Sequence, residues 1–551
     1  MKIATYNVNG LRPRISQYGS LRNFLDSLDS DIICLQETKL SRQELRADVV
    51  SADGYESFFS CSRSLLKGRT GYSGVATFCK VKSSFSTNEA ALPVDAEEGF
   101  TGLLHNYRDI SITEMAEGLE GFDRQELLKI DSEGRCIITD HSHFVLFNIY
   151  GPRAACDDVD RIQFKLSFYK ILQKRWEGLM LKGRRIIVAG DLNIAPSSID
   201  RCDAGPDFEN NEFRSWFRSL LVENGGLFFD VFRAKHPQRT EAYTCWSTNT
   251  GGEIFNFGSR IDHILSAGSC LHENKDLEGH NFFSCHVNEC DILTQFKRCK
   301  PGATTSYRWK GEKSIKLEGS DHAPVFISLT EIPDVPLHNT PSLSTRYCPQ
   351  VRGCQQTLVS MLSKRKSLEE VKAHEQSVTS LDEEISVQSC EPSVKSPLHD
   401  SCERKKKSKK GQSSQLSLKS FFSSSTANKD VKSISTDISF ERCETVILKD
   451  SEFNTSEPDQ VQCEPDTSSQ TDKSKSALLE WQRIQQFMQN SIPVCKGHGE
   501  QCVSRVVKKA GPTFGRRFYV CARAEGPASN PEANCGYFKW ADSGSKRKQE
   551  S

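Results

Sequence analysis

Residues 1–10 read MKIATYNVNG, a short apolar run that leads directly into two asparagines, Asn7 and Asn9. The same arrangement recurs through the first 330 residues, where runs rich in Ile and Val are each followed by a carboxylate, an amide or an imidazole. Runs of this length and composition predict buried β-strands. The later runs lead into Gln36 and Glu37, Tyr150, Asp191 and Asn193, Asp262, and Asp321 and His322.

If neighbouring strands end at one edge of a sheet, the polar residues that follow them meet there. An acidic, amide-rich edge with one histidine has the groups that metal-assisted hydrolysis of a phosphate ester needs. Each motif alone has a plainer explanation, since Gly-Asp-Leu-Asn at 190–193 is a common turn and Ser-Asp-His at 320–322 can be a cap or loop. Their joint occurrence favours the catalytic interpretation.

Composition excludes several classes of protein. The 551 residues carry 72 basic and 72 acidic side chains, and only 36% are hydrophobic, below the roughly 45–50% of an ordinary globular chain. Part of the chain is therefore expected to be unfolded. The sequence has no run of about 18 apolar residues, so it predicts no membrane span. Its N-terminus has no apolar secretory segment. The 21 cysteines, an odd number scattered through apolar runs, favour a reducing intracellular compartment, with thiols packed as small hydrophobes beside one metal site.

The sequence divides into three parts. Residues 1–332 have the texture of a folded domain, and residues 333–490 are rich in serine and charge and poor in aromatics. Such a segment buries too little apolar surface to offset its ordering entropy, so we expect a disordered linker, with a helix-period patch at 477–488. Cysteine, histidine and aromatics return at close spacing in residues 491–545, which predicts a small third unit.

Seven short blocks stand out in residues 1–330: YNVNGLR at 6–12, LQETK at 35–39, GYSGVA at 71–76, NIYGP at 148–152, GDLN at 190–193, SRID at 259–262 and GSDHAPV at 319–325. These blocks resemble the motifs of the exonuclease III family of apurinic/apyrimidinic (AP) endonucleases. The Gln-Glu-Thr-Lys block at 36–39 is the most diagnostic, because it separates the DNA enzymes from other phosphatases of the superfamily. The resemblance implies a four-layer α/β sandwich, with two packed mixed sheets flanked by helices.

The family's roles transfer to matching positions. The resemblance implies a Mg²⁺ site, in which Mn²⁺ can substitute, with Glu37 as the principal ligand. Asp191 would position or deprotonate the attacking water, Asp262 would orient His322 toward the phosphate, and Tyr150 would assist the phosphate or the leaving oxygen. The implied magnesium residues are Asn7, Asn9, Glu37, Asp191, Asn193, Asp321 and His322. The implied catalytic residues are Tyr150, Asp191, Asn193, Asp262 and His322, and the implied DNA contacts are Tyr72 and Arg153.

Two positions depart from the family pattern. Asn9 stands where many members carry Asp, and Arg153 stands where the major AP endonucleases tend to carry Asn. The first change removes one negative charge from the metal site. We therefore expect weaker metal affinity and weaker AP-site incision than in the major enzymes, with activity shifted toward 3′ ends.

Residues 494–541 carry eight Lys or Arg and three acidic residues, a local charge of +5 in a neutral chain. Basic groups interleaved with aromatics suit single-stranded nucleic acid, and the close Cys and His spacing suits structural zinc. The block resembles the GRF-type zinc finger, which implies the ligands Cys495, His498, Cys521 and Cys535 and one structural Zn²⁺. Spacing alone leaves Cys502 open as a fifth candidate. The implied DNA contacts are Lys508, Lys509, Arg516 and Phe518, whereas Phe538 and Trp540 are expected in the core.

Two signals fall in the linker. The basic run RKKKSKK at 404–410 favours a nuclear import signal or a DNA-binding patch over a merely solvated segment. The following QLSLKSFF at 415–422 fits the Gln-x-x-Leu-x-x-Phe-Phe box that binds the sliding clamp (PCNA), with Gln415, Leu418, Phe421 and Phe422 as the contact residues. A chance match is the alternative.

Together these features predict a nuclear, Mg²⁺-dependent DNA repair nuclease acting in base excision repair and 3′ end resection. Its expected activities are 3′→5′ exonuclease and 3′-phosphodiesterase, with a weaker AP endonuclease. Its expected partners are duplex DNA with abasic sites or 3′ ends, single-stranded DNA and the sliding clamp. The alternatives are a catalytically weak scaffold that binds DNA and the clamp, and a phosphatase of small phosphoesters.

Overall fold

The computed structural model describes residues 1–63, 71–81, 91–104, 116–272, 279–298, 318–352, 479–483, 492–509 and 511–541. The basic run at 404–410 and the clamp box at 415–422 lie outside these residues. Among the described helices, none combines the length and hydropathy that a bilayer crossing requires. The described residues include two folded parts, an N-terminal body within residues 1–352 and a finger within residues 492–541.

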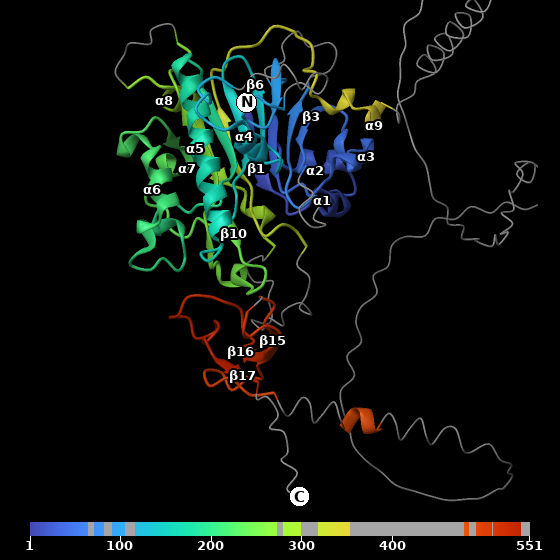
Figure 1. The fold of residues 1–551 in the computed structure, drawn as a ribbon, viewed down its shortest axis with the longest axis vertical. Coiled ribbons are helices and arrows are strands. Elements are labelled where there is room, and N and C mark those ends of the chain that lie inside the picture. Colours follow the sequence, from blue (N-terminus) through green and yellow to red (C-terminus); the bar gives the residue numbers. More distant parts are fainter. Residues whose placement is uncertain are drawn as a thin grey trace, which may run out of the picture. The chain divides into compact units, whose positions relative to one another are not determined.

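Two six-stranded mixed sheets form the centre of the N-terminal body (Figure 1). In each sheet the central pair of strands is parallel, β1 with β2 and β7 with β8, and the other pairs are antiparallel. The first sheet has the order β13 (Val287–Ile292), β14 (Val325–Leu329), β1 (Lys2–Asn7), β2 (Ile32–Gln36), β4 (Val75–Lys80) and β3 (Tyr55–Ser60). The second has the order β5 (Asp95–Glu98), β6 (Cys136–Asp140), β7 (Val145–Tyr150), β8 (Ile186–Asp191), β12 (Asp262–Ala267) and β9 (Phe229–Asp230). A separate two-stranded ribbon joins β10 (Cys245–Trp246) to β11 (Gly258–Ser259).

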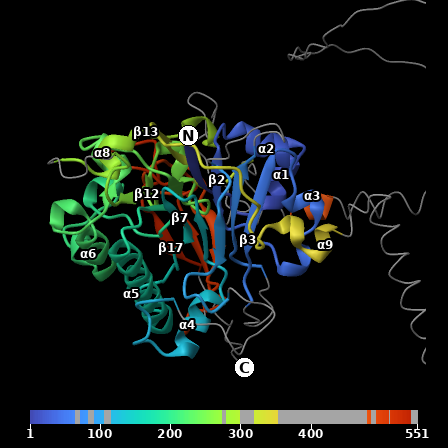
Figure 2. The ribbon, with the colours of Figure 1, turned by 90° about the horizontal axis from the view of Figure 1, so that it is seen from above.

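Helices cover the outer face of each sheet, as Figure 2 shows. One outer core lies under α1 (Leu11–Tyr18), α2 (Leu21–Ser27), α3 (Ala47–Val50) and α9 (Pro349–Arg352). The other lies under α4 (Arg124–Asp131), α5 (Val159–Leu181) and α6 (Glu212–Ser219). The short helices α7 (Val231–Lys235) and α8 (Phe282–His286) contact β12 and β13, one strand from each sheet.

Every residue of β2, β7, β8 and β12 is buried, so these strands are covered on both faces, which explains their apolar runs. In β8, Ile187 and Ala189 belong to the core between the sheets, while Ile186 and Val188 belong to the core beneath α5. Alternate side chains of a strand point to opposite faces, so one run of sequence supplies both cores. These layers confirm the four-layer α/β sandwich that the resemblance implies.

The polar residues meet at one edge of the sheets, but not all of them follow the end of a strand as expected. Asn7, Tyr150 and Asp191 are the last residues of their strands, as expected. Asp262 instead opens β12, and His322 precedes β14. Because β12 is antiparallel to β8 and β14 is antiparallel to β1, their beginnings lie where β8 and β1 end.

The folded body continues past the expected boundary at residue 332. Ser344 Oγ donates to Glu56 Oε2 at 2.7 Å, and Val335 and Val351 are buried. The 3₁₀-helix η9 (Thr345–Tyr347) contacts β3. Residues 333–352 therefore belong to the folded body, because small polar and apolar side chains in this serine-rich stretch find buried partners that composition alone does not reveal.

The finger has a three-stranded antiparallel sheet of β15 (Val503–Val506), β16 (Arg517–Val520) and β17 (Phe538–Trp540). Three of its cysteines, Cys495, Cys502 and Cys521, are buried together. Within the expected helical patch at 477–488, the described residues 479–483 are helical, and the side chains of Leu479 and Trp481 are exposed.

Candidate active site and zinc site

A buried histidine lies between two buried aspartates at the shared edge of the sheets. His322 Nδ1 is 2.8 Å from Asp262 Oδ2, and His322 Nε2 is 4.0 Å from Asp191 Oδ2. Burial alone would lower the pKa of His322, but the Asp262 carboxylate outweighs it and raises that pKa well above its usual value. Burial and the nearby Asp262 raise the pKa of Asp191. The cluster therefore offers a stable imidazolium beside a carboxylate that can take a proton.

Glu37 reaches the same edge from β2. Asn7 Nδ2 donates to Glu37 Oε1 at 3.1 Å and to Asp191 Oδ2 at 2.9 Å, so one amide joins the two carboxylates. Tyr150 OH also donates to Glu37 Oε1, at 2.7 Å, and Lys39 Nζ lies 3.0 Å from Glu37 Oε2. Burial acts to raise the pKa of Glu37, but Lys39, Tyr150 and Asn7 outweigh it and lower that pKa. Glu37 is therefore held ionised.

Asn9 contacts a third carboxylate through its neutral amide. Its Nδ2 donates to Asp321 Oδ1 at 2.8 Å, and its Oδ1 accepts a hydrogen bond from Lys39 Nζ. Thr248 Oγ1 donates to the second oxygen, Asp321 Oδ2, at 3.2 Å. Asn9 thus bridges a cation and an anion, which an aspartate at this position could not do.

Asn193 is held by its own turn. Its backbone N–H donates to Asp191 Oδ1 at 2.8 Å and its side chain to Gly151 O at 3.0 Å. A Cβ on the neighbouring Gly190 would lie 1.9 Å from Ile149 O on β7. Glycine at 190 therefore lets β8 approach β7 closely enough to place Asp191 beside Tyr150.

Four residues of this edge have left-handed backbone. The φ angles are 48° at Asn9, 51° at Glu37, 53° at Lys39 and 50° at Asn193. Such angles are uncommon for residues other than glycine and cluster at functional sites, where the surrounding structure holds them. The backbone is therefore bent at the positions that present the site's polar groups.

A buried polar link between the two sheets fixes this geometry. Gln36 Nε2 on β2 donates to Asn148 Oδ1 on β7 at 2.8 Å, and Asn148 Nδ2 donates to Ala76 O at 2.8 Å. Gln36 immediately precedes the site residue Glu37, and Asn148 stands two positions before the site residue Tyr150. The link therefore sets the separation of Glu37 and Tyr150.

The residues present fit a hard divalent cation. Glu37, Asp191 and Asp321 bring carboxylate oxygens to one edge, where the side-chain N–H groups of Asn7, Asn9 and Asn193 donate to them. Oxygen donors of this kind are what Mg²⁺ selects. Asp262 is committed to His322 and is better suited to orienting the imidazole than to binding the ion.

Of the two residues expected to contact DNA in the N-terminal body, one lines the cleft and the other lies outside its lining. Arg153 is exposed and lines the cleft that also contains Glu37, Tyr150 and His322. Tyr72 lies outside that cleft lining, and its ring is 5.9 Å from the guanidinium carbon of Arg135. Arg135 in turn lies 4.6 Å above the Tyr150 ring. The structure therefore links Tyr72 to Tyr150 through Arg135.

Sequence reasoning missed two residues that support the site. Arg135 is buried, pairs with Glu133 and donates to Tyr150 O at 3.0 Å. Lys165 lies on the buried face of α5, and its Nζ donates to Asn193 O at 2.9 Å. Burial lowers the pKa of Lys165 to about 7. A lysine on the helical stripe of Phe168, Leu172 and Trp176 is the signal that could have indicated it.

In the finger, the four expected zinc residues lie together. One ligand atom from each of Cys495, His498, Cys521 and Cys535 falls within 4.8 Å of the other three. His498 Nδ1 is 3.5 Å from Cys495 Sγ and 3.4 Å from Cys521 Sγ, close to the roughly 3.6 Å expected between sulfur and nitrogen ligands of a tetrahedral zinc. Cys502 is buried but lies outside the group, so it is a packing residue.

A glycine makes room for the fourth ligand. A Cβ on Gly497 would lie 2.5 Å from Cys535 Cβ and 2.9 Å from its Sγ. The Cys-x-Gly-His turn can therefore close on Cys535 only with glycine at 497. His498 Nε2 meets Pro531 O at 3.0 Å, which leaves Nδ1 as the ligand atom. These residues fit a structural zinc.

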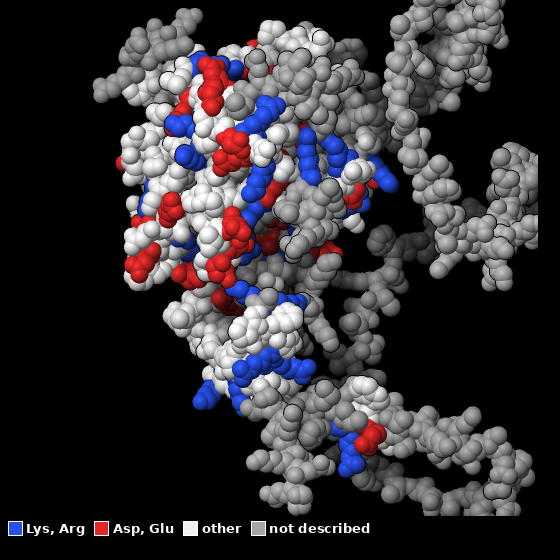
Figure 3. Space-filling view, in the orientation of Figure 1, with Lys and Arg blue, Asp and Glu red and all other residues white. Residues whose placement is uncertain are grey.

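The finger presents basic and aromatic side chains on its sheet. Arg516 lies 4.2 Å from the Trp540 ring, and Phe518 contacts the rings of Phe538 and Trp540 at centroid distances of 5.3 and 5.8 Å. The expected core position of Phe538 is wrong: its side chain is 51% exposed, because the small sheet has too few layers to cover both of its faces. Phe514, missed from sequence, is also exposed. Lys and Arg side chains gather on the visible face of the finger in Figure 3.

Comparisons with known proteins agree with both sites. Residues 4–322 match the Endonuclease/Exonuclease/phosphatase family, and residues 493–544 match the GRF zinc finger. The chain belongs to the endonuclease/exonuclease/phosphatase family. Within it, the chain belongs to the group of DNA-(apurinic or apyrimidinic site) endonuclease 2, to which it is similar over nearly its full length.

Three relatives support the membership in the endonuclease 2 group. The Mus musculus protein of this name is 32% identical over 581 residues, covering 98% of this chain and 99% of the relative. The Xenopus laevis protein is 33% identical, covering 98% of each chain. The Homo sapiens protein is 32% identical, covering 98% of this chain and 99% of the relative. The crystal structure of the Xenopus laevis APE2 catalytic domain is similar in fold, with a TM-score of 0.50 and 34% identity, and covers 65% of this chain and 100% of that one.

Proposed function

We propose that the protein is a Mg²⁺-dependent DNA repair nuclease whose main activities are 3′→5′ exonuclease and 3′-phosphodiesterase, with weaker AP endonuclease activity. The family membership and the names of the full-length relatives support the broader statement. One observation carries the mechanism: Asp191 lies 4.0 Å from the His322 imidazole and is joined to Glu37 through the Asn7 amide. These groups are close enough to act on one phosphate.

Asp191, His322 and Tyr150 have separate roles in the hydrolysis. Asp191, whose pKa is raised, accepts a proton from water as the water oxygen bonds to phosphorus and the bond to the leaving oxygen breaks. His322 donates its Nε2–H to a phosphoryl oxygen and offsets the developing charge, while Asp262 holds its Nδ1–H. Burial and Glu37 raise the pKa of Tyr150 above its usual value, so its phenol stays protonated and can donate to the leaving oxygen.

Glu37, with Asn7 and Asn9 beside it, would hold the magnesium ion. When bound, the ion would supply positive charge to the phosphate oxygens. Lys39, which pairs with Glu37 at 3.0 Å, occupies the same carboxylate and so competes with a cation for it.

The preference for 3′ ends rests on Asn9 and Arg153. Asn9 meets Asp321 as a neutral amide rather than as a second carboxylate, which supports a metal site of lower charge. Arg153 is an exposed cation in the lining of the cleft, where it can pair with the phosphates of a strand end. Both features support activity on terminal nucleotides over incision within an intact duplex.

The proposed substrate order is tested by comparing rates on a duplex with a recessed or mismatched 3′ end and on a duplex with one abasic site, each with Mg²⁺. We expect faster release at the 3′ end, with Asp191→Asn removing both activities. Much faster abasic incision would contradict the substrate order, and activity unchanged in Asp191→Asn would contradict the assignment of the site.

Outside the N-terminal body, we propose that the finger holds single-stranded DNA, that QLSLKSFF at 415–422 binds the sliding clamp, and that RKKKSKK at 404–410 directs the protein to the nucleus or binds DNA. The basic and aromatic surface around Arg516 and Phe518 supports the first of these roles. Together they would keep the nuclease at a strand end during base excision repair and resection.

A further inference from the structure

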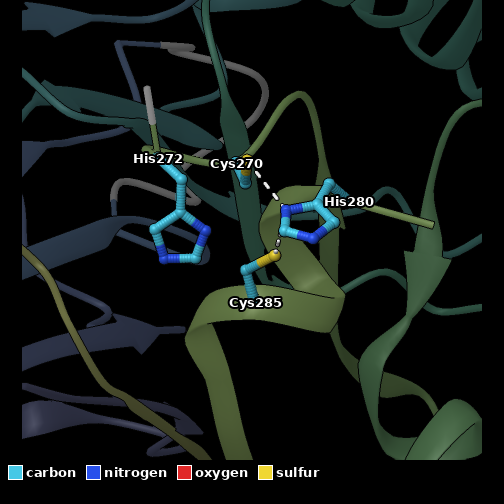
Figure 4. A group of neighbouring side chains, drawn as sticks. All are labelled: Cys270, His272, His280 and Cys285. Carbon is cyan, nitrogen blue, oxygen red and sulfur yellow. Dashed lines mark hydrogen bonds between the residues drawn. The ribbon is translucent and has the colours of Figure 1, made fainter. Parts of the chain in front are cut away.

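A second cluster of cysteine and histidine side chains lies in the N-terminal body, far from the finger's ligands in sequence. One ligand atom from each of Cys270, His272, His280 and Cys285 falls within 4.8 Å of the other three. Figure 4 shows Cys270, His280 and Cys285 facing one another, with a nitrogen of the His272 ring turned toward them. We propose that these residues form a structural zinc site of the Cys₂His₂ type.

The distances around His280 favour a shared ion over hydrogen bonds alone. His280 Nδ1 is 3.8 Å from Cys270 Sγ and 3.7 Å from Cys285 Sγ. A neutral imidazole nitrogen that accepts has one lone pair, so only one of the two thiols can donate to it. Tetrahedral zinc places sulfur and nitrogen ligands about 3.6 Å apart, near the observed separations.

His272 has the surroundings of a metal-binding histidine. Its Nε2 lies 3.1 Å from Glu331 Oε2, so the nitrogen that remains for the cluster is Nδ1. A ligating histidine commonly donates its other N–H to a carboxylate, which fixes the ring and makes the ligating nitrogen more basic. Glu331 therefore orients His272 and is not itself needed as a ligand.

His286, a nearby histidine, positions the site instead of joining it. Its Nε2 accepts the backbone N–H of Leu271 at 2.9 Å, and its Nδ1 lies 3.2 Å from Thr330 O. Both ring nitrogens are thus occupied, and the side chain is fully buried. By fixing Leu271, His286 holds the backbone between the ligands Cys270 and His272.

The location indicates a structural role. Asp262 opens β12 at the catalytic edge, and Ala267 ends it, which places them about 17 Å apart along the strand. Cys270 follows that far end, and Cys285 lies on α8, which packs on β12 and β13. Zinc here would tie the chain after β12 to α8 and would leave the catalytic edge unoccupied.

Zinc content of the full chain tests the site. The protein is purified with zinc, freed of loose metal, and its zinc measured against protein concentration by mass spectrometry. We expect two zinc ions per chain, one after Cys270→Ser with Cys285→Ser, one after Cys495→Ser with Cys521→Ser, and none when all four are changed. Cys156→Ser, an exposed cysteine outside both groups, should keep two.

A second measurement keeps the test valid if the double variant does not fold. In the unaltered chain, zinc should protect Cys285 from alkylation, and a chelator should expose it, while Cys156 reacts in both conditions. One zinc per chain in the parent, unchanged zinc in a folded Cys270→Ser/Cys285→Ser variant, or alkylation of Cys285 that ignores the chelator would each overturn the proposal. So would a mass showing Cys270 and Cys285 joined as a disulfide.

Discussion

His322 Nδ1 lies 2.8 Å from Asp262 Oδ2, and both side chains are buried. The aspartate therefore holds the imidazolium and aims its Nε2 at the cleft. We expect Asp262→Asn to lower kcat by about 10³- to 10⁴-fold with little change in KM, as for an aspartate that orients a catalytic histidine. Steady-state nuclease kinetics check this, with Asp140→Asn at the opposite end of the second sheet as the matched control. Parental kcat in Asp262→Asn would contradict the role.

Asn9 sets the charge of the metal site. Asn9→Asp places a carboxylate beside Asp321, where the amide now donates at 2.8 Å. Without a cation the two charges repel, so we expect the Mg²⁺ concentration for half-maximal activity to fall by about tenfold and the ratio of abasic incision to exonuclease activity to rise. Magnesium titrations of both activities measure this. Asn9→Ala removes the amide without adding charge and should not reproduce the gain; a gain in Asn9→Ala would contradict the electrostatic reason.

Glu133 makes stability dependent on pH in the acid range. Burial opposes its ionisation, but Arg161 and Arg135 outweigh burial and lower the pKa of Glu133 to about 2, against an unfolded value near 4.5. Its stabilisation is present above the unfolded value and is lost as pH falls toward the folded one. We expect about 2 kcal/mol of this contribution to disappear between about pH 6 and about pH 3.

Urea unfolding at the two pH values compares the parent with Glu133→Gln. The variant should be less stable at the higher pH and should lose less stability on acidification. Equal slopes of unfolding free energy against pH in the two proteins would show that Glu133 does not titrate as inferred.

Substituting the finger's exposed basic and aromatic residues should weaken DNA binding without changing the zinc content. Arg516→Ala with Phe518→Ala removes a cation over the Trp540 ring and an aromatic partner of Phe538. We expect single-stranded DNA affinity to fall by about tenfold or more, with the zinc content unchanged. Fluorescence anisotropy measures binding, and Lys496→Ala, which removes an exposed charge elsewhere in the finger, should have a smaller effect. If both variants lost the same DNA affinity, the net positive charge of the finger, and not the surface of Arg516 and Phe518, would explain binding.

The clamp box makes a separate prediction. Phe421→Ala with Phe422→Ala removes the two rings of QLSLKSFF and should abolish binding of the full chain to the sliding clamp, while nuclease activity without the clamp stays at the parental level. A pull-down with purified clamp measures the first effect. Ser423→Ala with Ser424→Ala, just outside the box, is the control, and unchanged capture of the double phenylalanine variant would count against the box.

Local sequence determined much of this protein. Apolar runs such as 186–189 specify strands that are buried on both sides, and Gly497 specifies a turn with room for Cys535. The resemblance of the motifs to the exonuclease III family implied the sandwich, and the resemblance of the finger to the GRF type implied its ligand set, because spacing alone left Cys502 open.

Only the tertiary structure decided which distant residues touch. The pairing of Asp262 with His322, the Asn7 amide between Glu37 and Asp191, and the link from Gln36 to Asn148 all join different strands. Composition placed the domain boundary before residues 333–352, although Ser344 and Val351 are buried. The cluster of Cys270, His272, His280 and Cys285 likewise emerged only when α8 packed beside the end of β12. Periodicity reports which face of a strand or helix is apolar, but the register and direction of neighbouring strands determine which polar groups meet.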